Sequence, residues 1–270
     1  MITKEIPYFN IAQICDSGQC FRMEKMDENR YSVIASGNYL EITQKGEKCI
    51  FSCEEEAFEI FWKNYFDLDT DYGEYLQQIN PNDTYLSRAG IFGSGIRILQ
   101  QNLWETIVSF LISQQNNITR IRKCIQNICE KYGEKRLNFR GEVYYTFPKA
   151  DALAKLEDDE LKMCNLGYRS KYVVRTAKSI VSGEVDLEKI QKMPYKKAKA
   201  ELLNLFGVGE KVADCICLFA LHHLQAFPID THIRQVLDKY YKRGFPNRRY
   251  KGFQGVMQQY IFYYELFGEK

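Results

Sequence analysis

The sequence is poor in the side chains that build metal centres and disulfide scaffolds. Its 270 residues include only 3 histidines, and the 9 cysteines contain no C-x-x-C pair. An odd number of cysteines, some of them in apolar helical stretches as Cys215 and Cys217 are, is typical of reduced thiols. These two are the only cysteines that follow Lys211, which excludes a four-cysteine iron–sulfur loop there. We therefore expect no metal site and no iron–sulfur cluster.

Long apolar runs are also absent. No uninterrupted run is long enough to span a bilayer, and residues 1–10 carry Lys4, Glu5 and Pro7 where a signal peptide has its apolar core. We therefore expect an intracellular protein with no membrane partner, in the cytoplasm or nucleoid of a prokaryote or in a nucleus. With 45% hydrophobic residues, the chain can bury a substantial core.

The net charge of +2 hides an asymmetry along the chain. Residues 1–80 carry 7 Lys and Arg against 15 Asp and Glu, net −8, whereas residues 81–270 carry 30 against 20, net +10. Two basic runs, within residues 162–178 and 239–251, contain no acidic residue. Such runs suit a polyanion, although an ordinary solvated surface is the commoner explanation when charge alone is considered.

The first fifty residues are patterned as strands and most of the rest as helices. Alternation of apolar and polar residues predicts antiparallel strands at 20–25, 31–35, 39–44 and 49–52. From Glu54 onward apolar residues recur three and four apart, first around Phe58 and then around Leu103, which predicts helices. Further helices are expected at 118–132, 169–182, 195–205, 210–221, 231–240 and 250–267.

These patterns predict an α+β fold, with an N-terminal antiparallel β-sheet domain packed on a mostly α-helical body. The sequence shows no repeat, no low-complexity segment and no long linker. We expect the boundary between residues 80 and 100, which gives a β-rich domain at 1–90 and a helical domain at 91–270.

The segment Leu205–Lys211 joins two helical patterns and contains two closely spaced glycines. Gly207 and Gly209 permit positive φ and leave backbone N–H groups uncovered, and the helix that opens at Glu210 points its first amides the same way. A DNA phosphate oxygen fits such a turn, although a plain helix-helix turn has the same pattern. Lys211 falls in the first helical turn, where the positive end of the helix dipole disfavours an ammonium group. This position suits an amine that is needed neutral.

Asp230 directly precedes the helix expected from Thr231, in the segment Phe227–Asp230. An aspartate there can cap the helix. Capping is compatible with catalysis, because a carboxylate held by backbone amides stays ionised at neutral pH and can face a developing cation. Both roles stay open at this point.

Together these segments resemble the 8-oxoguanine DNA glycosylase/lyases of the HhH-GPD superfamily, named for a helix-hairpin-helix, a Gly/Pro-rich loop and an aspartate. Each matching piece is modest, but their combination in one order is specific and covers nearly the whole chain. The pieces are Ser17–Arg22, Ser109–Arg120, Gly167–Arg169, Gly207–Cys215, Phe227–Asp230 and Gln258–Phe262. The resemblance implies that residues 91–270 form the HhH-GPD glycosylase domain and that residues 1–90 contribute to the base pocket.

The resemblance implies a bifunctional enzyme that acts on double-stranded DNA containing 8-oxoguanine. Lys211 would attack the sugar C1′ and form a Schiff base, and Asp230 would stabilise the positive charge at C1′. Breakage of the strand by β-elimination would follow. Because attack needs a neutral amine, the pKa of Lys211 must fall from about 10.4 through burial and the helix terminus.

The target base must leave the duplex to be excised. In the family pattern Phe262 and Cys215 stack on opposite faces of the base, and Gln258 hydrogen-bonds its Watson–Crick edge. The resemblance implies that the backbone carbonyl of Gly18 accepts from the N7–H group that guanine lacks. Bound guanine would set two acceptors face to face, which costs about 1 to 3 kcal/mol of binding free energy. Pro228 completes the implied pocket. Without the resemblance, Phe262 indicates an ordinary core aromatic residue.

The resemblance also implies two sets of DNA contacts. Residues that fill the hole left by the flipped base are Gln115, Asn116, Arg120, Tyr168 and Arg169. Residues at the phosphates are Gly207, Gly209, Val212 and His232, of which His232 alone would indicate a surface histidine. The family commonly has asparagine where this chain has Gln115, and we still expect cytosine to be the preferred base opposite the lesion.

Two other functions remain open. The same fold could act as a monofunctional alkyl-base glycosylase, which has no use for the amine of Lys211, or as a non-catalytic module that uses the hairpin as a phosphate clip. The resemblance implies a monomer without a cofactor. A hairpin of this type can nevertheless coordinate a cation through backbone carbonyls.

Overall fold

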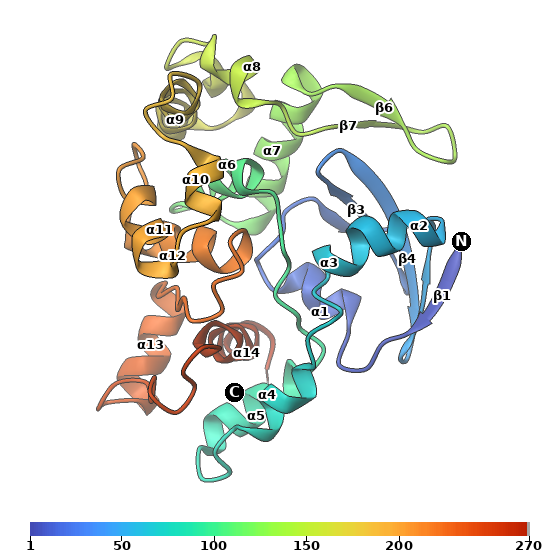
Figure 1. Ribbon diagram of the computed structural model, residues 1–270, viewed down its shortest axis with the longest axis vertical. Coiled ribbons are helices and arrows are strands. Elements are labelled where there is room, and N and C mark those ends of the chain that lie inside the picture. Colours follow the sequence, from blue (N-terminus) through green and yellow to red (C-terminus); the bar gives the residue numbers. More distant parts are fainter. Residues whose placement is uncertain (269–270) are drawn as a thin grey trace. The chain divides into compact units, whose positions relative to one another are not determined.

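The computed structural model describes residues 1–268 and combines an antiparallel sheet with a larger set of helices (Figure 1). The sheet has five strands in the order β1-β5-β4-β3-β2. These are β1 (Ile2–Glu5), β2 (Met23–Lys25), β3 (Arg30–Ala35), β4 (Asn38–Lys45) and β5 (Lys48–Phe51). The prediction of an α+β fold with an N-terminal antiparallel sheet and a helical body is confirmed.

Strand β5 joins the first strand of the chain to the rest of the sheet. Phe51 lies opposite Ile2 of β1 on one side and opposite Ile42 of β4 on the other. Within β5, Cys49 and Phe51 are buried while Ile50 is exposed, as expected for side chains that alternate between two faces of a sheet.

The N-terminal fifty residues contain more than the predicted strands. Strand β1 and helix α1 (Ile11–Asp16) were not predicted. The expected strand at 20–25 begins only at Met23, because residues 17–22 form an irregular loop between α1 and β2. This loop contains Gly18.

The major helices follow the predicted apolar period. Two of them have the predicted bounds, α7 (Ile118–Tyr132) and α13 (Thr231–Tyr240). Four others differ from prediction by a few residues at their ends: α9 (Ser170–Val181), α11 (Tyr195–Leu202), α12 (Glu210–Phe219) and α14 (Gln254–Phe267). Helix α6 (Leu103–Ser113) lies where the apolar period around Leu103 predicts a helix.

The remaining elements are short. The helical signal after Glu54 is confirmed as three consecutive segments, α2 (Glu55–Ala57), the π-helix η1 (Phe58–Trp62) and α3 (Lys63–Tyr65). Elements that were not predicted are α4 (Tyr72–Gln77), α5 (Thr84–Phe92), β6 (Lys135–Leu137), β7 (Val143–Tyr145), α8 (Ala150–Ala154), η2 (Glu160–Cys164), η3 (Gly167–Arg169) and α10 (Leu187–Gln191). No helix within residues 1–268 has the length and apolar character needed to cross a membrane.

The chain divides into two compact units, each assembled from separated stretches of sequence. Unit 1 contains residues 1–32, residues 40–100 and the described residues from 222 onward, and unit 2 contains residues 33–39 and 101–221. In unit 1, α14 packs on α5 and α13; in unit 2, α12 packs on α6 and α11 (Figure 1). The predicted domains at 1–90 and 91–270 stay a prediction.

Candidate active site

The hairpin at Leu205–Lys211 joins α11 to α12 in unit 2 and places Lys211 at the start of α12. Gly207 has a φ of +92°, and a Cβ there would lie 2.6 Å from Cγ of Tyr172, so only glycine fits. Gly209 differs, because its φ is −103° and nothing lies within 4 Å of an added Cβ. Of the two glycines that permit positive φ, only Gly207 adopts it, whereas Gly209 leaves open space beside its bare backbone.

The N-terminus of α12 has amides available for an anion. Gly209 is its N-cap and offers no side chain to the helix, and the first turn of the helix closes with Ala213 N donating to Gly209 O at 2.9 Å. The amides of residues 210–212 therefore have no acceptor within the helix. An uncapped, exposed helix N-terminus of this kind is a phosphate-binding arrangement.

Gln114 holds the other side of the hairpin and was missed by the sequence analysis. Its Nε2 donates to the carbonyl oxygen of Gly207 at 3.0 Å. The bond links the end of α6 to the hairpin, 93 positions later in the chain. Nothing in the local sequence separates this glutamine from its neighbour Gln115.

Lys211 lies half-buried against an aromatic wall of unit 2. Its Nζ is 5.3 Å from the centroid of the Phe110 ring, which stacks on Phe219 with centroids 5.6 Å apart. No carboxylate within residues 33–39 and 101–221 forms an ion pair with Lys211. Cys215, one turn further along α12, is buried. The side chain of Lys211 is therefore not positioned by a salt bridge within its unit.

A polar brace fixes α12 against α11 and was also missed. The carboxylate of Asp214, three residues after Lys211, accepts from the Tyr195 hydroxyl at 2.6 Å and from Lys199 Nζ at 2.9 Å. Burial raises the pKa of Asp214, although the hydrogen bonds from Tyr195 and Lys199 oppose this rise. The spacing of Tyr195 and Lys199, four apart on one helix, is the sequence signal that could have indicated a shared partner.

The residues expected to replace the flipped base gather at the end of α6. Gln115 is exposed with a φ of +47°, and the hydroxyl of the exposed Tyr168 lies 3.5 Å from its Oε1. Arg169 is only 4% exposed, and its guanidinium donates to the carbonyl oxygens of Gln114 at 2.8 Å and Gln115 at 2.9 Å. Arg169 thus supports the loop that presents Gln115.

Two further residues of this group lie nearby in the chain. The Asn116 side chain donates to the carbonyl oxygen of Ile112 at 3.1 Å, which fixes its orientation. Arg120 is exposed on the first turn of α7, and its guanidinium reaches the carbonyl oxygen of Asn165 only at 3.5 Å. Arg120 and Gln115 are therefore accessible to a ligand, whereas Arg169 contacts one only by exchanging its present bonds.

In unit 1, Asp230 caps α13. Its Oδ1 accepts from Ile233 N at 2.8 Å, so the predicted capping role is confirmed. Pro228, two residues earlier, is buried, and His232 lies half-buried with its ring centroid 6.2 Å from that of Phe262. The helix start therefore places His232 beside the predicted pocket aromatic.

The structure brings together three of the predicted pocket residues. Gln258 and Phe262 are both on α14, Gln258 buried and Phe262 half-buried. Gly18 has a φ of +74°, and a Cβ there would lie 3.1 Å from Cε1 of Phe262. Within residues 1–268, the carbonyl oxygen of Gly18 accepts no hydrogen bond. An unused acceptor therefore belongs to the residue that packs against Phe262.

Two family models match consecutive parts of this chain. The first is an 8-oxoguanine DNA glycosylase N-terminal domain, at residues 1–107, and the second an HhH-GPD superfamily base excision DNA repair protein, at residues 108–248. The chain belongs to the HhH-GPD superfamily. Its hairpin, Lys211 and Asp230 lie within the HhH-GPD match, whereas Gly18 lies within the N-terminal match.

Relatives of this HhH-GPD protein match most of its length. The crystal structure of Clostridium acetobutylicum 8-oxoguanine glycosylase/lyase in its apo-form is 37% identical with a TM-score of 0.90, covering 97% of this chain and 94% of that one. The same enzyme in complex with double-stranded DNA containing cytosine opposite 8-oxoguanine also has a TM-score of 0.90, at 37% identity over 96% and 92% of the two chains. The Saccharomyces cerevisiae N-glycosylase/DNA lyase is 28% identical over 263 residues, which are 86% of this chain and 68% of the relative.

The described residues do not form a metal site from side chains. Among residues 1–268, no three or more His, Cys, Asp and Glu side chains are placed to hold one ion. All nine cysteines are thiols, and all but Cys53 are buried. The expectation of no cofactor, and the alternative of a cation held by hairpin carbonyls, both stay predictions.

Proposed function

We infer that this HhH-GPD protein is a bifunctional DNA glycosylase and AP lyase that excises 8-oxoguanine from double-stranded DNA. The observation that carries this conclusion is Lys211 on the first turn of α12, directly after an uncapped hairpin. The near full-length similarity to 8-oxoguanine glycosylase/lyases supports the same conclusion. The hairpin would bind a phosphate and thereby bring an amine to the neighbouring sugar.

The first chemical step breaks the bond between base and sugar. The neutral Nζ of Lys211 supplies an electron pair to C1′, and the bond from C1′ to the base breaks with its electron pair on the departing base. Positive charge develops at C1′ in the transition state, and the Asp230 carboxylate stabilises it. Because Asp230 also caps α13, its backbone partner keeps it oriented for this role.

The second step breaks the DNA strand. Opening of the sugar ring converts the C1′ adduct into a protonated Schiff base, which makes the C2′ hydrogen acidic. A base removes that proton, the electron pair forms the C1′–C2′ enamine and then a C2′–C3′ double bond, and the C3′ oxygen leaves with its phosphate. Water finally hydrolyses the Schiff base and releases Lys211. An enzyme without the amine would stop after removing the base.

The pocket proposal assigns lesion recognition to Gly18, Cys215, Pro228, Gln258 and Phe262. The flipped base would stack on Phe262 with Cys215 on its other face, while Gln258 reads its Watson–Crick edge. The Gly18 carbonyl would accept the N7–H of 8-oxoguanine. The closeness of Gly18 to Phe262 supports this proposal, because a Cβ added at Gly18 would lie only 3.1 Å from the ring proposed to stack on the base.

DNA contacts are proposed for two further sets of residues. The amides of Gly207, Gly209 and Val212, with His232, would hold phosphates of the lesion strand. Gln115, Asn116, Arg120, Tyr168 and Arg169 would contact the base opposite the lesion. Cytosine would be preferred there, because a guanidinium can donate to its acceptor edge. We propose that the protein works as a monomer, without a cofactor, on the DNA inside its cell.

Cleavage of duplexes that carry 8-oxoguanine opposite each of the four bases tests this function. The wild-type protein should cut the lesion strand, fastest opposite cytosine. Lys211→Gln should lower cutting by at least about 10³-fold, the scale of losing a catalytic group, while lesion binding survives. The matched control is Lys196→Gln, an exposed lysine on α11. A wild-type protein that removes alkylated bases and leaves 8-oxoguanine in place would contradict the proposal.

A further inference from the structure

The side chain of Gln19, next to Gly18, is buried and has defined partners on both ends of its amide. Gln19 is 1% exposed. Its Nε2 donates to Ser17 Oγ at 2.8 Å and to the carbonyl oxygen of Arg97 at 2.9 Å, while its Oε1 accepts from Leu99 N at 2.8 Å. Because both amide hydrogens and the amide oxygen are used, the side chain has one favourable orientation.

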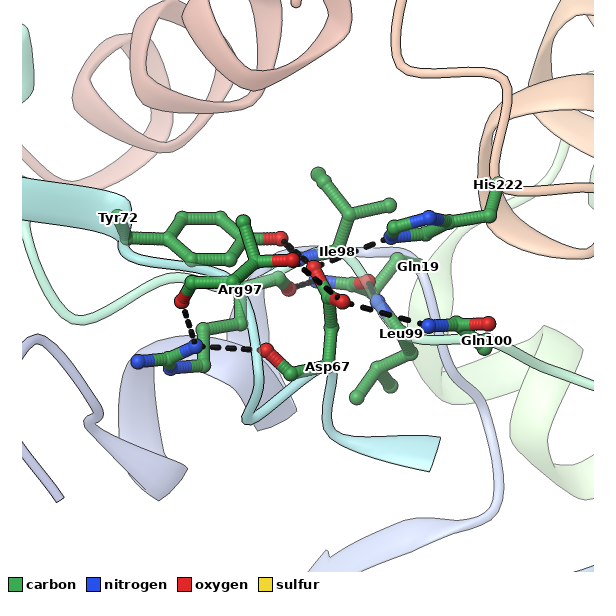
Figure 2. Close-up of polar contacts among 9 residues, drawn as sticks. Gln19, Asp67, Tyr72, Arg97, Ile98, Leu99, Gln100 and His222 are labelled. Atoms are coloured by element: carbon green, nitrogen blue, oxygen red, sulfur yellow. Dashed lines mark hydrogen bonds and ion pairs between the residues drawn. The ribbon is translucent and has the colours of Figure 1, made fainter. Parts of the chain in front are cut away.

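The backbone at residues 97–99, which Gln19 contacts, is itself held in place (Figure 2). Arg97 is buried, and its guanidinium donates at 2.7 to 3.1 Å to four carbonyl oxygens, those of Pro7, Tyr8, Asp67 and Thr70. The hydroxyl of Tyr72 accepts from Ile98 N at 2.8 Å and donates to Asp67 Oδ2 at 2.8 Å. The segment is therefore fixed from the side opposite Gln19.

Asp67 is the charged centre of this cluster. Besides Tyr72, it accepts from Thr70 Oγ1 at 2.8 Å and Gln100 Nε2 at 3.3 Å, and His222 Nε2 lies 3.1 Å from its Oδ2. Burial acts to raise the pKa of Asp67, but the neighbouring imidazole of His222 foremost, together with the hydroxyls of Tyr72 and Thr70, outweighs burial and holds this pKa below its ordinary 3.8. A carboxylate thus anchors Tyr72, and through it the backbone that Gln19 contacts.

Ser17, on the other side of Gly18, is the last residue of this hydrogen-bonded network. Ser17 is fully buried, and its hydroxyl donates to the carbonyl oxygen of Ile14 at 2.8 Å while accepting from Gln19. Gly18 therefore lies between two side chains that are bound to fixed backbone, and a Cβ added to it would lie 3.1 Å from the ring of Phe262. A peptide flanked in this way cannot rotate without breaking buried hydrogen bonds.

We propose that Gln19 is a positioning residue for lesion recognition, which fixes the direction of the Gly18 carbonyl. The proposal rests on the proposed function, because it needs a base with an N7–H donor in the pocket. A carbonyl that could turn away would lose its bond to 8-oxoguanine and would also stop repelling guanine, whose N7 is an acceptor. Discrimination therefore requires a rigid peptide, and Gln19 supplies the rigidity.

Gln13 provides a matched control on the preceding helix. Its Nε2 donates to the carbonyl oxygen of Phe92 at 2.9 Å and its Oε1 accepts from Gly95 N at 2.8 Å. It therefore bridges α1 to the same region of the chain with the same kind of amide contacts. Neither of these two contacts involves residues 17–19.

The test compares two single-turnover rates on duplexes with cytosine opposite the site, excision of 8-oxoguanine and strand cleavage at a preformed abasic site. Only the first rate needs a base in the pocket. Gln19→Leu should lower the ratio of the two rates about tenfold, the value of one or two buried hydrogen bonds. Gln13→Leu should keep the wild-type ratio. A purely structural role for Gln19 would lower both rates alike, because it would reduce only the fraction of active protein.

Three results would overturn the proposal. They are an unchanged ratio in folded Gln19→Leu, an equal fall of the ratio in Gln13→Leu, and an unchanged ratio in the milder variant Ser17→Ala. If Gln19→Leu does not fold, Ser17→Ala decides, because it removes one acceptor of the Gln19 amide and should lower the ratio roughly threefold. Failure of the proposed function gives a different result, since the wild-type protein itself would then not excise 8-oxoguanine.

Discussion

Gly207 and Gly18 both have positive φ, at +92° and +74°, but their surroundings hold them by different means. Gly207 belongs to a hairpin that is followed within a few residues by the uncapped amides of α12 and by Lys211. Gly18 belongs to a loop held by Gln19, whose amide reaches residues 78 and 80 positions away. The proposed nucleophile is therefore placed mainly by residues close to it in the chain, with Gln114 as a distant support, whereas the proposed recognition loop is held mainly by contacts between distant parts of the chain.

The largest effect is expected at Asp230, where replacement by asparagine removes the negative charge and keeps the helix cap. Asp230→Asn should lower the rate of base excision by about 10²- to 10³-fold, because the group proposed to stabilise charge at C1′ becomes neutral. The melting temperature should barely change, since asparagine caps helices as well as aspartate does. Asp186→Asn is the matched control, because Asp186 caps α10 in the same way by accepting from Lys189 N at 3.0 Å. Equal loss of activity in both variants would show that Asp230 acts only through the helix.

Gly18→Ala tests the loop at residues 17–22, which is proposed to recognise the lesion and is called the recognition region. An added Cβ meets Phe262 at 3.1 Å and forces alanine into positive φ, which costs about 1 to 2 kcal/mol. Excision of 8-oxoguanine should fall about 10- to 100-fold, which corresponds to that free energy together with the displaced ring. Gly141→Ala is the control, because Gly141 has a φ of +78° and nothing within 4 Å of an added Cβ. If Gly141→Ala slows excision equally, backbone strain and not the pocket explains the effect.

Asp67→Asn tests whether the recognition region depends on a buried charge. Because the pKa of Asp67 is held below 3.8 in the folded protein, its carboxylate stabilises the fold above that pH. The variant should be about 1 to 3 kcal/mol less stable at pH 7, the cost of breaking a buried charged network. The difference should shrink as pH falls below 3.8 and through the lower folded pKa, because the wild-type carboxylate then protonates. Urea unfolding at several pH values measures it, and a difference that grows toward acid pH would contradict this account.

The smallest effect is expected from a basic loop that belongs to neither region. Arg248 and Arg249 are exposed between α13 and α14 and form no ion pair within the described chain. If they lie along the DNA backbone, Arg248→Gln with Arg249→Gln should lower the slope of log affinity against log salt by about 2, equally for lesion and undamaged duplex. The control pair is Lys45→Gln with Lys48→Gln, exposed in the acidic N-terminal part. An unchanged slope would remove this loop from the DNA-binding surface.

The sequence predicts the bounds of an element correctly where residues close in the chain determine its ends. Helices α7 and α13 have the predicted bounds because Asn117 and Asp230 cap them within three residues. Strand β1 was missed, since Ile2–Glu5 becomes a strand only by pairing with β5, more than forty residues away. The irregular loop at 17–22 takes the place of the first half of the strand predicted at 20–25 for a similar reason, because its backbone follows the Gln19 contacts and not local alternation.

The site residues show the same difference between features set by nearby residues and features set by distant contacts. The positions of Lys211, Cys215, Gln258 and Phe262 on their helices could be read from spacing alone. The Gln114 bond to the hairpin and the Asp214 brace could not, because a polar residue in a helical pattern does not name its partner. The buried state of Arg169 was equally invisible, since arginine is usually exposed.

Borohydride trapping on duplex DNA with 8-oxoguanine opposite cytosine tests the central claim most directly. A Schiff base between the sugar C1′ and Lys211 would be reduced to a stable amine, so we expect a covalent protein–DNA complex whose cross-linked peptide contains Lys211. Lys211→Gln should form no such complex, while Lys196→Gln should form as much as the wild-type protein. A complex that persists in Lys211→Gln, or a wild-type protein that excises the base without being trapped, would contradict the account.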